Sequence, residues 1–171
     1  MQSAVPPFRA DMVGSLLRSV PLKNARASNE AGKFSADQLR AVEDVEIVNL
    51  IRKQEAIGLD AVTDGEFRRA YWHFDFLQHL DGCEGFWMDS TTAAQQKQVS
   101  FKGAALRPWM VRFVGKLGFS AAHPHLQHFK FLKCNTTRVA KMTIPSPSML
   151  HYRGGRSAIS QTTYPSLDAF Y

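Results

Sequence analysis

The sequence predicts an α/β fold, in which parallel strands alternate with helices. A long helix expected over 36–57 leads directly into a strand-forming stretch at 60–64. Two further candidate core strands lie at about 8–13 and 140–144. A strand–helix–strand unit of this kind implies parallel strands joined by a right-handed crossover. The alternation limits the architecture to a doubly wound sheet or a (β/α)8 barrel.

Glycines and a capping motif set the boundaries of the first predicted helices. A short helix around 22–30 ends before Gly32. Ser35, with Gln38 three residues later, forms a capping box for the long helix, and Gly58 is a natural C-terminal stop. Apolar residues recur at helical spacing on one face of this helix. Charged residues mostly fill the other face: Glu43, Asp44, Arg52 and Lys53.

The stretch between the second and third core strands predicts a departure from simple alternation. A helix is expected over 72–80, ended by an Asp-Gly pair. The stretches 98–103 and 109–119 have the alternation of strands and suggest a β-hairpin excursion. Pro124 then begins a helix that leads to the third core strand.

Composition places the chain among globular proteins of one ordinary domain. It has 171 residues, of which 44% are hydrophobic and 21% charged. No apolar run approaches the roughly 20 residues of a membrane helix, and the N-terminus lacks the pattern of a signal peptide. The net charge is +6, but its basic residues are scattered. We therefore expect a cytoplasmic protein that binds neither membrane nor nucleic acid.

Polar or special-backbone residues follow each predicted core strand. They are Gly14-Ser15, Asp64-Gly65-Glu66 and the segment 145–148. Ligands sit at the carboxyl ends of parallel strands in both candidate architectures. Asp64 and Glu66 would point the same way on an extended segment, where they could bind an ammonium group or transfer protons, or form a solvated turn.

The neighbouring arginines and the histidines have competing interpretations. Arg68 and Arg69 could clamp an anion, but a surface position or an ion pair to nearby acids is the plainer expectation. The His-Pro-His sequence at 123–125 lacks a completing ligand and is expected to be a surface turn. His73 and His79 are expected to be packing residues, whereas His151 is placed on the same predicted face as Glu66. Cys83 and Cys134, the two cysteines, are expected to be buried small hydrophobes.

Three motifs resemble one known family. "FRADMVGSLLR", "IGLDAVTDGEFRRAYWHFDFLQHLDG" and "KMTIPSPSMLHYRGG" are similar to the start of the catalytic barrel of cobalamin-independent methionine synthase, and more so to its short single-barrel paralogues. The resemblance covers essentially the whole chain in the right order. It implies that 1–171 is the N-terminal part of an incomplete (β/α)8 TIM barrel domain, with the hairpin excursion between core strands 2 and 3.

The resemblance also implies an activity and a set of substrate contacts. The family transfers a methyl group from a methyl-folate to the thiolate of homocysteine, with a zinc ion that lowers the thiol pKa. Val13, Gly14 and Ser15 match the segment that holds the amino-acid substrate through its backbone and hydroxyl. Glu66 matches the glutamate that receives the homocysteine ammonium, with Asp64 in a supporting role. More weakly, the resemblance places Arg107 and His151 near segments that contact the folate.

The family's zinc ligands, a His-x-Cys pair, a glutamate and a second cysteine, lie in later strands. Neither Cys83 nor Cys134 falls in a matching motif, so we assign no catalytic or metal-binding residue. We expect a truncated chain that is inactive alone and that associates with itself or with a complementary half-barrel. The alternative is a non-catalytic remnant or interaction module that needs a complementary chain to fold.

Overall fold

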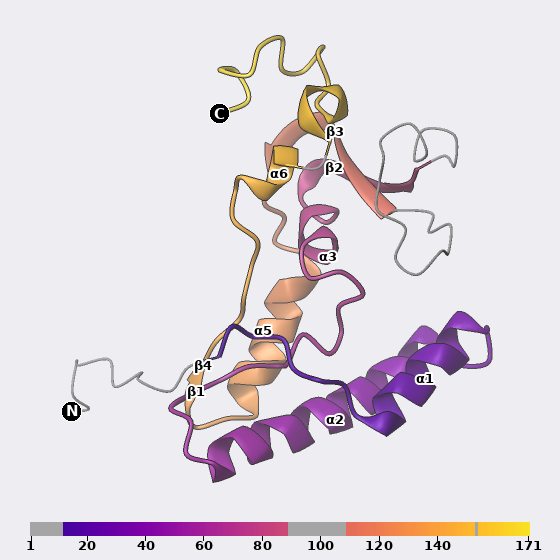
Figure 1. Ribbon diagram of the computed structural model, residues 1–171, viewed down its shortest axis with the longest axis vertical. Helices are drawn as coiled ribbons and strands as arrows, with labels where there is room; N and C mark the ends of the chain where they lie inside the picture. The colour runs from indigo at the N-terminus through magenta and orange to yellow at the C-terminus, as the bar shows by residue number, and fades with distance from the viewer. Residues whose placement is uncertain (1–11, 89–108, 153) are drawn as a thin grey trace. The chain divides into compact units, whose positions relative to one another are not determined.

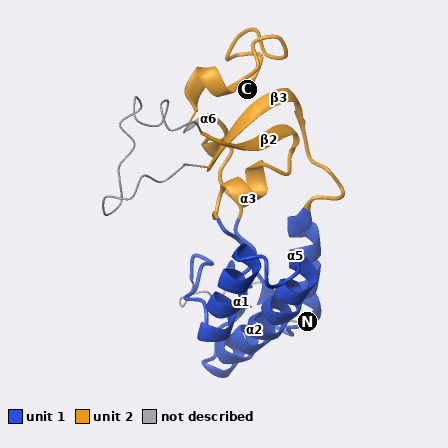
Figure 2. Cartoon of the chain, turned by 90° about the vertical axis from the view of Figure 1, so that its right-hand side faces the viewer, with its two compact units in different colours: residues 1–70, 124–143 blue, residues 71–123, 144–171 orange. Residues whose placement is uncertain are grey.

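The structure, a computed structural model, describes residues 12–88, 109–152 and 154–171. Figure 1 follows the chain from one end to the other. The chain divides into two compact units (Figure 2). Unit 1 consists of residues 1–70 and 124–143, and unit 2 of residues 71–123 and 144–171. No helix among the described residues has both the length and the apolar character needed to cross a membrane.

Unit 1 begins with two helices that pack against each other (Figure 1). Helix α1 spans Val20–Glu30, and helix α2 spans Ala36–Ala56. Both halves of the predicted capping box are formed: the Ser35 hydroxyl accepts from the Gln38 amide, and the Gln38 side chain accepts from the Ser35 amide. The helix ends before Gly58, so the predicted bounds are confirmed at both ends.

A short parallel sheet completes the order of elements in unit 1. Strand β1, Ala61–Val62, pairs in parallel with β4, Val139–Ala140. Helix α5, Pro124–Cys134, precedes β4 and begins at the predicted proline. Short strands thus occur near the second and third predicted core strands and pair in parallel. Strand β1 is shorter than predicted, and β4 overlaps the predicted 140–144 at residue 140 alone. Most of the first predicted strand, 8–13, lies outside the described residues, and its last two residues are not in a strand.

The core of unit 1 lies between its helices and this sheet. Helices α1, α2 and α5 each contribute, together with β1 and the turn after it. The fully or almost fully buried apolar residues are Leu22, Ile47, Ile51, Val62, Phe67 and Leu132. An α/β arrangement of this kind confirms the predicted fold class, while closure into a barrel stays a prediction.

Unit 2 contains an antiparallel strand pair. Strand β3, Trp109–Gly118, confirms the strand predicted there, and its partner is β2, Asp81–Trp87. The sequence did not predict β2, since two glycines and two acids in this stretch are typical of a turn. The helix expected over 72–80 is correspondingly reduced to α3, Phe74–Leu77. The other predicted strand, 98–103, lies outside the described residues.

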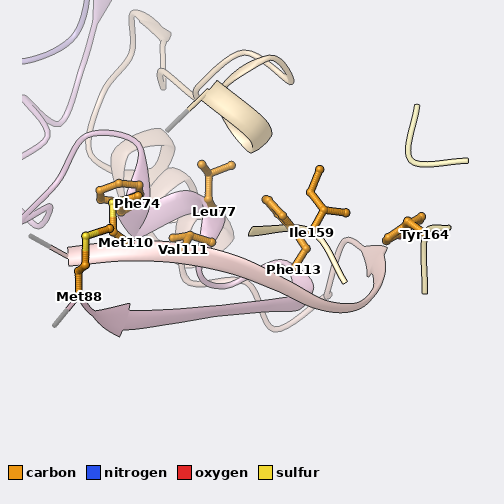
Figure 3. Packing of buried hydrophobic residues seen from close by; sticks show 8 residues of the cluster. All are labelled: Phe74, Leu77, Met88, Met110, Val111, Phe113, Ile159 and Tyr164. Carbon is orange, nitrogen blue, oxygen red and sulfur yellow. The ribbon is translucent and has the colours of Figure 1, made fainter. Parts of the chain in front are cut away.

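The C-terminal part of unit 2 packs on this strand pair. It contains the short helix α6, Met149–Tyr152, and a 3-10 helix, η1, Gly155–Ala158. The Ser160 amide donates to the Phe113 carbonyl at 2.8 Å, next to a parallel bridge between Phe113 and Ile159. Figure 3 shows the resulting apolar cluster. Its buried members are Phe74, Leu77, Met88, Met110, Val111, Phe113, Ile159 and Tyr164.

Candidate functional site

The chain turns sharply after β1, and Glu66 lies at the centre of the turn. Its φ is +58°, and it is the only non-glycine residue with positive φ among those described. Gly65 before it has φ +67°. A left-handed conformation in a non-glycine residue costs free energy and persists only where its surroundings fix it. The backbone conformation that directs the Glu66 side chain is therefore maintained at a cost in free energy.

Hydrogen bonds within the turn support this conformation. The Glu66 amide donates to Asp64 Oδ1 at 3.0 Å, and the Arg69 amide donates to the Glu66 carbonyl at 3.1 Å. Asp64 is buried, and burial raises the pKa of its carboxyl, although the bond from the Glu66 amide and the charge of Arg69 act against the shift. Asp64 therefore orients the turn, while its supporting role in substrate binding stays a prediction.

The predicted segment Val13-Gly14-Ser15 lies directly beside this turn. The Thr63 hydroxyl donates to the Gly14 carbonyl at 2.8 Å, and the Leu16 amide donates to the Gly65 carbonyl at 3.0 Å. A Cβ at Gly14 would lie 2.7 Å from Thr143 Cγ2, so only glycine allows the close approach. Val13 and Ser15 on either side are exposed. Two segments about 50 residues apart in sequence thus form one surface.

The Glu66 carboxylate is largely buried, and its contacts fix its position. Thr143 Oγ1 donates to Oε1 at 2.6 Å, and Arg69 forms an ion pair with the same oxygen at 3.4 Å. The Arg69 guanidinium also donates to the Thr143 carbonyl. Within the part of the chain that the structure describes, both contacts of the carboxylate fall on Oε1. The other oxygen, Oε2, can therefore accept from a cationic group of a ligand.

Arg68 joins the turn to the helices of unit 1. It forms ion pairs with Glu43 at 3.3 Å and with Asp44, and its guanidinium lies 5.0 Å from the centre of the Phe131 ring. Its side chain is only 6% exposed, so the expected surface position is wrong. Its ion-pair partners lie on α2 and are not the neighbouring acids that were expected. Arg69 is buried as well.

Glu43 was also misplaced by the sequence pattern, because it is buried rather than on the solvated face of α2. It pairs with both Arg26 and Arg68, while burial raises the pKa of its carboxyl. The signal that could have found it is spacing. Glu43 precedes the buried Ile47 by four residues and Ile51 by eight, which places it on the same helical stripe.

Three structural supports of the site have no counterpart in the sequence prediction. The buried Gln54 side chain accepts from the Thr63 amide and donates to the Thr63 carbonyl, both at 2.9 Å. Thr143 follows the end of β4 and reaches Glu66. The Arg18 guanidinium donates to backbone carbonyls of the turn. These contacts join residues 9 to 77 positions apart, so no short sequence motif predicts them.

The two residues predicted near the folate are not placed by the structure. Arg107 lies outside the described residues. His151 falls within α6 of unit 2, but its side chain is not among those described. Their proposed roles stay predictions.

Histidines 123 and 125 correct another expectation. Both are buried, at 1% and 5% exposure, instead of forming a surface turn. His123 Nε2 lies 3.0 Å from the Phe76 carbonyl, and burial lowers the pKa of its ring. His73 is buried against Phe74, with ring centres 3.9 Å apart, which confirms its predicted packing role. His79 is exposed.

The cysteines also differ from expectation. Cys83 is half-buried, and burial raises the pKa of its thiol to about 12. Cys134, at the end of α5, is exposed rather than buried. Among the described residues there is no group of three or more His, Cys, Asp or Glu side chains able to hold a metal ion. The described side chains therefore do not fit a zinc ion, and a thiol with a raised pKa is a poor ligand.

Comparison with known proteins adds family relationships to this geometry. The family model described as "Cobalamin-independent synthase, Catalytic domain" matches residues 8–107. The Bacillus subtilis proteins YxjG and YxjH, both uncharacterized, are 46% identical over 90% and 85% of this chain. The chain spans 39% and 37% of their lengths, or about two fifths.

Two further matches extend the comparison to a named enzyme and to a solved structure. A 5-methyltetrahydropteroyltriglutamate–homocysteine methyltransferase from Synechococcus is 32% identical over 63% of this chain and 15% of its own length. A Listeria monocytogenes structure, classed as a vitamin-B12 independent methionine synthase, is 42% identical. The structural match covers 97% of this chain and 43% of the Listeria chain, with a TM-score of 0.73.

Proposed function

The chain belongs to the cobalamin-independent methionine synthase family, and from this premise we propose that it binds the amino-acid acceptor of a methionine-synthase-like methyl transfer. The acceptor is a homocysteine-type thiol and the donor a methyl-folate, the substrate classes in the name of the Synechococcus relative. One observation carries the proposal. A conformationally strained, buried Glu66 is fixed beside the Gly14-Ser15 segment, as an amino-acid site requires.

Each residue of this surface has a chemical task in the proposal. The Glu66 carboxylate accepts a charge-assisted hydrogen bond from the substrate ammonium. The exposed Ser15 hydroxyl and the backbone of Val13 and Gly14 hold the carboxylate end of the amino acid. Thr143 and Arg69 keep the Glu66 carboxylate oriented through their contacts with Oε1. This arrangement holds the ammonium and carboxylate groups of the substrate and assigns no contact to its thiol.

The fold and the donor side belong to the same proposal. We assign 1–171 to one (β/α)8 barrel domain, in which β1 and β4 are neighbouring barrel strands and the β2–β3 pair is an excursion. The parallel register of β1 and β4 and the likeness to the Listeria structure support this assignment. Arg107 and His151 are proposed folate contacts. A cytoplasmic location fits such a metabolic activity.

Zinc would serve the family's reaction by lowering the pKa of the acceptor thiol. Since the described side chains do not fit the ion, we assign no ligand among them and derive no step through it. The proposed contribution of this chain is substrate binding.

The test is binding of L-homocysteine by the wild-type chain and by Glu66→Gln, measured by calorimetry. Loss of one charge-assisted hydrogen bond should weaken binding by about tenfold to a hundredfold. 4-Mercaptobutyrate, which lacks the ammonium group, should bind both proteins equally. Glu84→Gln is the matched control, because this exposed carboxylate pairs with Arg112 in unit 2. Equal homocysteine affinity in wild type and Glu66→Gln would remove Glu66 from the site.

The alternative, an interaction module, predicts a different result. Such a chain would not bind homocysteine at millimolar concentration, and sedimentation would show it self-associated or captured by a complementary chain. Measuring binding and sedimentation on the same preparation separates the two functions.

A further inference from the structure

One guanidinium contacts three backbone carbonyls of the turn around Glu66. Arg18 donates to the Glu66 carbonyl at 3.1 Å, to the Phe67 carbonyl at 3.4 Å and to the Arg69 carbonyl. It does so from a position 48 to 51 residues earlier in the chain. Three acceptors that face one side chain require a donor with several N–H groups in a plane, which only arginine provides.

We propose that Arg18 is a positioning residue that holds Glu66 in its left-handed conformation and so aims its carboxylate at the substrate ammonium. This inference rests on the proposed amino-acid site. It adds Arg18 to that site as a residue that acts on the substrate through Glu66. Arg18 acts on Glu66 through its hydrogen bonds to backbone carbonyls of the turn.

The geometry gives a reason why the turn needs this contact. A left-handed Glu66 is fixed only if the peptide groups on both sides of it are held. The amide side is held by Asp64. On the carbonyl side, Arg18 and the Arg69 amide both donate to the backbone carbonyl of Glu66. Removing Arg18 leaves the contact between Asp64 and the Glu66 amide intact, but the Glu66 carbonyl then keeps the Arg69 amide alone of these two donors.

Arg18 also lies on the segment that contributes the rest of the site. It follows Ser15 by three residues, and between them the Leu16 amide donates to the Gly65 carbonyl. The guanidinium therefore closes a second link between the two substrate-binding segments. Arg26 supports the same turn through the Phe67 carbonyl at 3.2 Å, but it does not reach the Glu66 peptide and is shared with Glu43.

The experiment compares Arg18→Lys with wild type. Lysine keeps the charge and most of the packing but concentrates its donors on one nitrogen, so it cannot span three carbonyls. Homocysteine affinity should fall about tenfold, the equivalent of one lost charged hydrogen bond. Affinity for 4-mercaptobutyrate should not change. Arg52→Lys is the control, since Arg52 is exposed and its ion-pair partner among the described residues is Glu55 of its own helix.

A double-variant cycle tells positioning from general stabilisation. In a Glu66→Gln background, Arg18→Lys should cause no further loss of homocysteine affinity, because the group through which it acts has been neutralised. An equal loss in both backgrounds, or an equal loss for both ligands, overturns the proposal. Arg18→Met serves as a second variant without charge, and it should show the same pattern with a larger loss.

Amide hydrogen exchange tests the inference without any ligand. Arg18→Lys should raise exchange at the Arg69 amide, whose acceptor is the Glu66 carbonyl, and leave the amides of α2 unchanged. Unchanged exchange at Arg69 overturns the inference even if Glu66 binds the ammonium. Unchanged homocysteine binding in Glu66→Gln, with raised exchange in Arg18→Lys, refutes the proposed function alone.

Discussion

The two units of this chain differ in the kinds of side chain that each one buries. In unit 1 the turn after β1 buries charged side chains, among them Asp64, Glu66 and Arg69. Unit 2 is organised around an apolar cluster centred on Phe113, and its buried polar residues among those described are two histidines. Buried charges are expensive and survive only when paired. In unit 1 these charges are concentrated in one turn, where ion pairs and hydrogen bonds compensate for their burial.

The ion pairs of the two units show the same contrast. Arg68 in unit 1 pairs with Glu43 while both side chains are under 10% exposed. Arg112 in unit 2 pairs with Glu84 across the strand pair, with side chains 52% and 43% exposed. An exposed pair contributes at most about 1 kcal/mol, whereas breaking a buried pair leaves an uncompensated charge. The buried pair of Arg68 and Glu43 therefore helps to fix local geometry in unit 1, whereas the exposed pair of Arg112 and Glu84 contributes little in unit 2.

The largest expected effect is a truncation in the apolar core of unit 2. Phe113→Ala should lower the free energy of unfolding by about 3–5 kcal/mol, because it leaves a cavity beneath Ile159 and Phe170. All three tryptophans, Trp72, Trp87 and Trp109, belong to unit 2, so urea unfolding followed by their fluorescence reports on this unit. The exposed Phe119 supplies the control, and Phe119→Ala should change little.

A smaller effect is expected when the buried pair of unit 1 is broken. Arg68→Met keeps a contact with Phe131 but leaves Glu43 with Arg26 alone. The cost should be about 2–3 kcal/mol, since Glu43 remains buried and half of its partners are lost. Circular dichroism of helices α1, α2 and α5 should report the loss. Arg112→Met, which breaks the exposed pair, should cost under about 1 kcal/mol.

A double substitution sharpens this second comparison. Arg68→Met combined with Glu43→Gln should recover part of the lost stability, because the uncompensated carboxylate is gone. If Arg68→Met costs no more than Arg112→Met, charge plays the same minor role in both units, and the contrast drawn between them fails.

Local signals in the sequence predicted the elements whose causes are local. The capping box of Ser35 and Gln38 gives the start of α2, and Gly58 gives its end. Proline 124 gives the start of α5. Strand β2 was missed because its glycines and acids are poor strand formers, and only the ladder with β3 keeps them extended. Tertiary pairing overrides propensity there.

The candidate site divides in the same way. Gly14-Ser15 and Glu66 were predicted because strand ends and family motifs identify them. Glu43 could have been predicted from its spacing to Ile47, but its charge argued against burial. Arg18 could not have been predicted, since its acceptors are backbone carbonyls 48 to 51 residues away that leave no mark in residue type.

The smallest expected effect is a pH dependence confined to the charged turn of unit 1. Burial raises the pKa of Asp64 above its ordinary value of 3.8, so the folded chain holds this proton more tightly than the unfolded chain does. Stability due to Asp64 must therefore fall as pH rises from 3.8 through the folded pKa, and level off above it. Asp64→Asn has no such proton, while its amide oxygen can still accept from the Glu66 amide.

The measurement is the difference in unfolding free energy between wild type and Asp64→Asn across the acidic range, followed by circular dichroism. Glu43, whose pKa is also raised by burial, is present in both proteins and cancels from the difference. The wild type should lose stability relative to the variant as pH increases. A relative gain would mean that the Glu66 amide and Arg69 outweigh burial, and that the turn is stabilised by the ionised Asp64 in spite of its desolvation.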